Sequence, residues 1–197
     1  MLTLLASIVR AASNVDLLML PIEPLSPVAL VNMLTVLPEP NVLKVALPLE
    51  TASAIVDHAL QLGNKHGLLP LTVVVLDTGG HMLTMKREDG SGIMRTDVAT
   101  GKAWGALGMG ISSRTIRNRL ADRPSFQGAL AAASQGRFIP VPGGVLICDK
   151  EGVVIGAVGV SGDASDKDEF VAVEAIKAVK LTPYPAEPDD SWQDAGL

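Results

Sequence analysis

The sequence is poor in cysteine, in aromatic residues and in clustered positive charge. Its single cysteine, Cys148, rules out an internal disulfide, and the apolar run around it predicts an inert core thiol rather than a reactive one. Aromatic residues make up only 3% of the chain, so the core has to be built from aliphatic side chains. A formal net charge of −5 without a basic cluster argues against a nucleic-acid partner.

Long uninterrupted apolar runs are missing as well. Residues 1–20 are largely apolar, but five prolines follow within residues 21–40, whereas a membrane-spanning helix needs about 20 apolar residues. No basic residue precedes the apolar stretch, as one would in a signal peptide. We therefore expect no membrane partner and a cytoplasmic location.

We divide the 197 residues into an N-terminal extension (1–45), one folded domain (46–181) and a C-terminal tail (182–197). For the extension three interpretations stay open: an arm that packs on a neighbouring subunit, a poorly ordered leader, or an over-long gene start. The tail is rich in proline and aspartate, and Trp192 within it is expected to dock on the domain.

Two β-hairpins are predicted within the domain. Residues 71–76 form a continuous β-branched apolar run, and residues 82–85 return as a second strand after the turn at 77–80. Residues 145–148 and 153–160 repeat this arrangement around the turn at 149–152. Hairpins favour an antiparallel sheet with helices packed beside it.

Helical periodicity predicts the remaining elements. Helices are expected over residues 48–68, 95–109, 113–120, 126–134 and 166–180. Gly101, Gly105 and Gly108 make the second of these intrinsically weak, which indicates the close approach of another backbone or a ligand.

Several segments together resemble a known family. These segments are VVLDTGGHML, KREDG, TDVATGKAWGA, VPGGVLI and VIGAVGVSGDASDKDEFVA. With them, residues 47–181 resemble the GlcG/HbpS family, which also occurs as the C-terminal domain of some corrinoid adenosyltransferases. The resemblance implies an α+β, profilin-like fold of three α/β/α layers around a five-stranded antiparallel sheet. We place the fifth strand around residues 138–141. Members are oligomers, often octamers, so a homo-oligomer is implied, and some bind or degrade haem.

The resemblance also points to particular polar positions. They are the strand exit Arg87 and Asp89, the helix lysine Lys102, the pair Gly143 and Gly144, and the positions Ser161, Gly162 and Asp168. Each of them lies near the end of a predicted element, so we expect them to converge on one cleft.

A haem site would need an axial ligand and cations for the propionates. His58 and His81 are the axial candidates, and Arg87, Lys102 and Arg137 are the cations. The chain has no CxxCH attachment motif. His58 and His66 are eight residues apart, too far for a simple two-histidine metal site, and we predict no metal site.

Three functions follow from these residues. The first is a small-ligand-binding protein, with haem or another tetrapyrrole as the ligand. The second is an enzyme that acts on a small organic acid by general acid–base chemistry. In it, Asp89 or Asp168 would move the proton, and Lys102 or Arg87 would hold the substrate carboxylate. The third is an oligomeric scaffold.

Overall fold

The computed structural model describes residue 26 and residues 44–197, and the fold below is that of the unit Lys44–Leu197. The predicted N-terminal extension lies almost entirely outside the described residues, so its three interpretations stay predictions. Among the residues that are described, no helix combines the length and the apolar character needed to cross a membrane.

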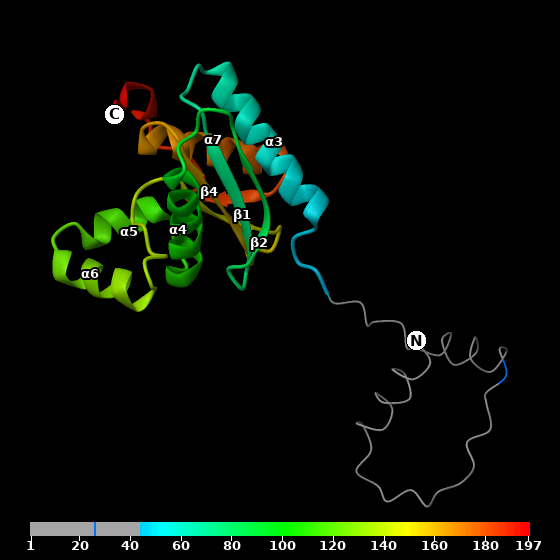
Figure 1. The fold of residues 1–197 in the computed structure, drawn as a ribbon, viewed down its shortest axis with the longest axis horizontal. Coiled ribbons are helices and arrows are strands. Elements are labelled where there is room, and N and C mark those ends of the chain that lie inside the picture. The colour runs from blue at the N-terminus through cyan, green and yellow to red at the C-terminus, as the bar shows by residue number, and fades with distance from the viewer. Residues whose placement is uncertain (1–25, 27–43) are drawn as a thin grey trace, which may run out of the picture. The chain divides into compact units, whose positions relative to one another are not determined.

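A five-stranded sheet forms the centre of this unit (Figure 1). Its strands are β1 (Thr72–Asp77), β2 (Met82–Arg87), β3 (Gly144–Cys148), β4 (Val154–Ser161) and β5 (Thr182–Tyr184). They lie in the order β2-β1-β4-β3-β5, and every neighbouring pair is antiparallel. Both predicted hairpins are therefore confirmed, and they meet in one sheet through β1 and β4.

Helices cover both faces of the sheet. The helices α3 (Leu49–Lys65) and α7 (Ser165–Ala178) pack together on one face, and α4 (Met94–Met109) lies on the other. The helices α5 (Ser113–Leu120) and α6 (Pro124–Ala133) follow α4 and project from that side (Figure 1). The predicted α+β fold of three layers is confirmed.

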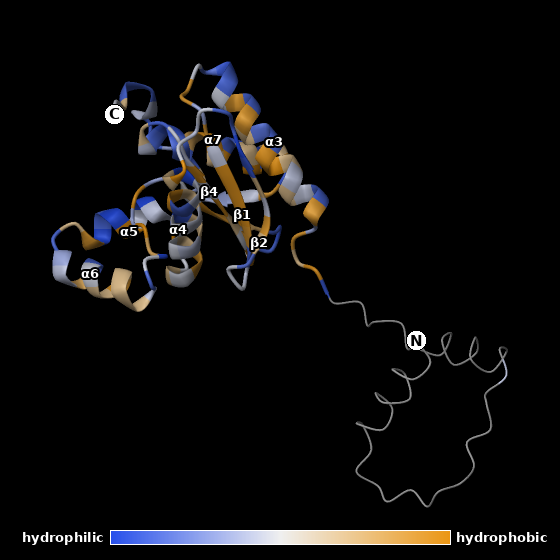
Figure 2. Cartoon of the chain, in the orientation of Figure 1, coloured by the Kyte–Doolittle hydropathy of each residue, from blue (hydrophilic) through white to orange (hydrophobic). Residues whose placement is uncertain are grey.

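The side chains of β1 alternate between two hydrophobic cores. Val73 and Val75 belong to the larger core beneath α3 and α7, whereas Val74 and Leu76 belong to the core beneath α4. Because both faces of β1 are covered, its sequence reads as a continuous apolar run rather than as an alternating one. Figure 2 shows β1 as a hydrophobic strand flanked by helices.

Glycine positions let α4 lie directly on the sheet. A Cβ at Gly159 would overlap the carbonyl of Ala99, and one at Gly144 would overlap the carbonyl of Lys102. For the helix glycines we expected another backbone or a ligand, but at Gly101 it is a side chain that comes close: a Cβ there would lie 2.7 Å from the side chain of Ile139. The α4 backbone is thus fixed against β3 and β4 without room for a methyl group.

The predicted fifth strand at residues 138–141 is wrong. The fifth strand is β5, from the segment that we assigned to the tail, and it pairs with β3. Residues 138–141 turn towards α4 and α5 instead: Phe138 is buried with Ile116, and the Ile139 amide donates to the Gly101 carbonyl. Pro140 and Pro142 also lack the amide protons that a sheet ladder requires.

Candidate functional site

An ion pair, the buried bridge, joins Lys102 of α4 to Asp168 of α7. Lys102 Nζ lies 2.8 Å from Asp168 Oδ2 and donates a second hydrogen bond to the Val160 carbonyl at 2.9 Å. The two side chains are only 2% and 1% exposed. Since α4 and α7 lie on opposite faces of the sheet, the bridge connects the outer layers at the end of β4.

Two of the predicted positions, Gly143 and Gly144, pack closely against Lys102. Gly143 has a φ of 113°, which favours glycine, and a Cβ there would lie 3.0 Å from Lys102 Nζ. The amide of Gly144 donates to Ser113 Oγ at 2.7 Å, which fixes the start of β3 against α5. The double glycine is therefore part of the packing around the ion pair.

Burial dominates the electrostatics of the bridge. It lowers the pKa of Lys102, although Asp168 acts in the opposite direction. It also raises the pKa of Asp168 to about 6, although Lys102 opposes the shift. The amide of Asp163 donates to Asp168 Oδ1 at 3.2 Å, so both carboxylate oxygens have a donor. A buried ion pair with this many partners is suited to joining layers of the fold.

Ser161 and Gly162 lie at the same end of β4. The Ser161 hydroxyl accepts a 3.3 Å hydrogen bond from Arg95, a residue that sequence reasoning missed. A Cβ at Gly162 would lie 2.5 Å from the Pro70 carbonyl, so this glycine is also required by packing. Arg95 stands in the first turn of α4, and no local pattern in the sequence directs its side chain towards β4.

Arg87 and Asp89 lie in a different place, which we call the strand-exit hollow. This cavity of about 490 Å³ is lined by Asn64, Leu68, Pro70, Arg87, Glu88 and Asp89. Glu88 is held in the wall of this hollow because its carboxylate accepts hydrogen bonds from the Leu71 amide and from Asn64 Nδ2. The structure thus brings Arg87 and Asp89 together, but neither Lys102 nor Asp168 lines their hollow.

His58 lines a second cavity, the His58 hollow, of about 480 Å³ between α3 and α7. Its lining residues are His58, Gln61, Leu62, Lys65, Glu174, Lys177 and Ala178. The Lys177 ammonium donates to Glu174 Oε1 at 2.9 Å and to Glu187 Oε2 at 2.6 Å. The hollow thus combines a half-buried histidine, two apolar side chains and two lysines, one of which is paired with the carboxylate of Glu174.

His81 and Arg137 lie elsewhere. His81 sits in the turn between β1 and β2, with its side chain 82% exposed and Nδ1 3.4 Å from Asp77 Oδ1. The Arg137 guanidinium stacks over the Trp104 ring at 4.6 Å. Gly80, next to His81, approaches the same indole. The structure does not bring His81 to the hollow of His58.

The lysines of the His58 hollow were also missed. His58, Leu62 and Lys65 follow one another at i, i+4 and i+7, a spacing that places them on one helix face and could have indicated Lys65. Lys177 comes from α7, more than 100 residues later, and no local signal connects it to His58. Within residue 26 and residues 44–197, no group of three His, Cys, Asp or Glu residues could hold a metal ion.

Comparisons with known proteins point to one family. A family model described as "Haem degrading protein HbpS-like" matches residues 47–177. A 15.0 kDa protein from the dhaT–dhaS intergenic region of Citrobacter freundii is 32% identical over 108 residues, which are 55% of this chain and 75% of that protein. The corrinoid adenosyltransferase PduO of the same organism is 24% identical over 57% of this chain, but the match spans only 33% of PduO.

Among solved structures, the fold is matched by a crystal structure of a PduOC:heme complex. The TM-score is 0.65 at 23% sequence identity, over 71% of this chain and 99% of that one. At 23% sequence identity, this similarity shows that the two chains share a fold.

Proposed function

Because the chain belongs to the HbpS-like family of haem-degrading proteins, we propose that it binds haem or a related tetrapyrrole in the His58 hollow. The observation that carries the proposal is the combination of one histidine with two lysines around a cavity. The structure of a relative of the same fold, the PduOC:heme complex, supports the choice of ligand.

The residues of the hollow fit this group. His58 is a nitrogen ligand of the kind that haem iron takes, and Lys65 and Lys177 supply positive charge for propionates. Leu62 and Ala178 supply an apolar wall. The volume of about 480 Å³ lies within the usual range for small-molecule sites, and its open side would leave part of a macrocycle at the surface.

His58 is preferred to His81 as the axial ligand because of their surroundings. His58 is half-buried and its cavity carries two cations, whereas His81 is almost fully exposed beside the carboxylate of Asp77. Near that turn Arg137 supplies one cation and Trp104 an aromatic surface. The turn of His81 is therefore the second candidate for the same ligand.

Titration with haemin, followed by absorbance, tests the proposal. We expect a saturable Soret shift for the wild type that His58→Ala abolishes or weakens at least tenfold. His81→Ala is the matched control, since it removes an imidazole outside the hollow, and it should leave the titration unchanged. A shift that is lost only in His81→Ala would move the site to the β1–β2 turn. No saturable shift in the wild type would contradict haem binding.

An enzyme acting on a small organic acid stays the alternative. In this fold Lys102 and Asp168 form an ion pair that is buried away from solvent, so a substrate cannot reach it. A substrate carboxylate would instead have to bind Arg87 in the strand-exit hollow, with Asp89 as the base. Turnover of a carboxylic acid that is lost in Asp89→Asn and kept in Asp168→Asn would favour this alternative. Assembly into a homo-oligomer, a scaffold role and a cytoplasmic location stay predictions.

A further inference from the structure

The C-terminal segment, residues 182–194, is held on the domain at several points, and we call it the C-terminal strap. It begins as β5 on the edge of the sheet and ends in the short helix Trp192–Asp194. The Trp192 ring stacks on Phe170 of α7 at 3.7 Å, and His66 meets both rings edge-on. The docking that was predicted for Trp192 is confirmed.

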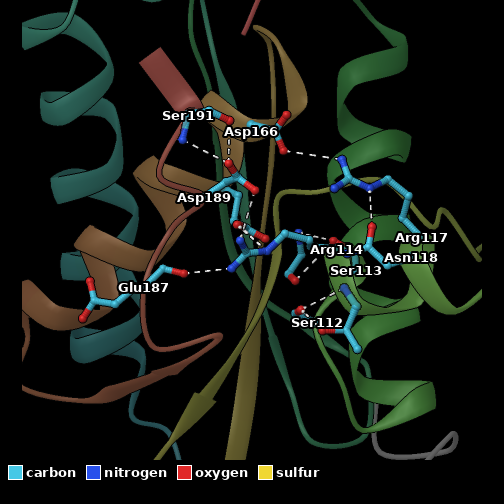
Figure 3. Close-up of polar contacts among 12 residues, drawn as sticks. Ser112, Ser113, Arg114, Arg117, Asn118, Asp166, Glu187, Asp189 and Ser191 are labelled. Carbon is cyan, nitrogen blue, oxygen red and sulfur yellow. Dashed lines mark hydrogen bonds and ion pairs between the residues drawn. The ribbon is translucent and has the colours of Figure 1, made fainter. Parts of the chain in front are cut away.

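Arg114 of α5 holds the middle of the strap (Figure 3). Its Nη2 donates to the Glu187 carbonyl at 2.9 Å, and its Nη1 lies 3.4 Å from Asp189 Oδ2. On its other side Arg114 Nε lies 3.1 Å from the fully buried carboxylate of Glu169. One guanidinium therefore fixes the backbone of Glu187 relative to α5 and α7.

With its backbone fixed in this way, Glu187 pairs its carboxylate with a lysine of the His58 hollow. Its Oε2 lies 2.6 Å from Lys177 Nζ, and Lys177 is one of the two lysines that line the hollow. The Glu187 side chain is 74% exposed, so it can leave Lys177 without burying a charge. Glu174 keeps its own 2.9 Å contact with the same ammonium and remains in the hollow.

We propose that Glu187 is an internal competitor that occupies Lys177 until a carboxylate of the ligand replaces it. The inference rests on the proposed function, since the ligand is the one in the His58 hollow. The Glu187 carboxylate then stands in for an anionic group of the ligand, and binding requires the strap to give up this contact. The strap thereby weakens the site for ligands with carboxylates and leaves ligands without carboxylates unaffected.

The competition predicts a measurable change in the affinity for the ligand. An exposed ion pair contributes little in water, so its removal is expected to tighten the binding of a carboxylate ligand roughly two- to fivefold. The pKa of Lys177 is raised, because its hydrogen bonds to Glu187 and Glu174 outweigh the opposing effect of burial. In Glu187→Gln the 2.9 Å contact with Glu174 remains and the Lys177 side chain is 31% exposed, so the ammonium keeps its charge and is available to the ligand.

Haemin and its dimethyl ester, which lacks the carboxylates, separate the outcomes. Both are titrated by absorbance into the wild type, Glu187→Gln and the control Asp190→Asn. The control removes the same charge from an exposed strap residue for which the described residues show no ion pair. We expect Glu187→Gln to bind haemin two- to fivefold more tightly than the wild type, with no change for the dimethyl ester and none in the control.

Each other result has a definite meaning. Equal haemin affinity in the wild type and Glu187→Gln would overturn the competition and leave the proposed haem site intact. Equal tightening for the ester would also overturn it, because the effect would then not depend on the ligand carboxylates. Equal tightening in Asp190→Asn would overturn it as well, because the effect would then not depend on the contact between Glu187 and Lys177. An absence of binding in the wild type and in Glu187→Gln would overturn the proposed function and this inference with it.

Discussion

The buried bridge and the His58 hollow use similar side chains for different purposes. Lys102 is 2% exposed and its ammonium meets a carboxylate and a carbonyl, so its charge is fully used within the fold. Lys177 is 31% exposed, its partners are exposed or half-buried carboxylates, and it faces open space beside His58. A charged residue is therefore a better candidate for ligand binding when its partners are replaceable than when it is merely buried.

Lys102→Met tests the structural side of this comparison and should have the largest effect. The substitution keeps most of the length of the side chain, which becomes one atom shorter, but leaves Asp168 buried without its cation. We expect a loss of about 3–5 kcal/mol in the free energy of unfolding, measured by urea denaturation. The double variant with Asp168→Leu should recover much of this loss, because no buried charge remains. A single variant as stable as the wild type would show that the bridge does not hold the layers together.

The pH dependence of stability tests a second buried carboxylate, that of Glu169, which contacts Arg114. Burial raises the pKa of Glu169 to about 7, although Arg114 acts to lower it. Because the folded state binds this proton more tightly than the unfolded chain, the stabilisation is complete below pH 4.5 and is lost as the pH rises through 7. We expect this carboxylate to remove about 3 kcal/mol of stability between pH 5 and pH 8.

Glu169→Gln isolates this contribution, because the amide keeps the shape of the side chain and cannot titrate. Denaturation at pH 5, 6, 7 and 8 should give a flatter profile for the variant than for the wild type. Some slope will remain, since the pKa of Asp168 is also raised, to about 6. Identical slopes in the two proteins would mean that Glu169 does not titrate in this range.

Gly144→Ala probes the contact that places Lys102 at the bridge. A Cβ at this position would overlap the Lys102 carbonyl, so α4 would have to move away from β3. Overpacking of this kind costs about 2 kcal/mol, which thermal or urea denaturation would detect. Gly128→Ala in α6 is the control, because nothing lies within 4 Å of a Cβ there and alanine favours a helix. Equal stability of the two variants would contradict the close packing of α4.

Much of the fold could be predicted from local patterns, and its exceptions have local causes. The strands β1, β3 and β4 carry β-branched residues, and both hairpins have turn residues that are visible in the sequence. The strand β5 has only three residues, Thr182–Tyr184, with a proline at its centre, so it shows no periodicity. Its existence depends on the free edge of β3, which only the folded sheet provides.

The candidate site was harder to predict because its contacts join distant segments. Lys102 and Asp168 were both selected from the sequence, but their contact spans 66 residues and depends on α4 and α7 meeting at the end of β4. Lys65 shares a helix face with His58 and could have been found from spacing alone. Lys177 and Glu187 join the hollow through packing, for which the sequence contains no local signal.

His58→Ala should have the smallest effect on the protein alone and thereby completes the comparison with Lys102. His58 is half-buried and lines a cavity, so its removal should change the unfolding free energy by less than about 0.5 kcal/mol. A ligand that binds only the folded state raises its stability by about 2.7 kcal/mol at a hundredfold excess over its dissociation constant. We therefore expect haemin to raise the melting temperature of the wild type and not that of His58→Ala. A variant that is strongly destabilised without haemin would instead place His58 among the residues that hold the fold.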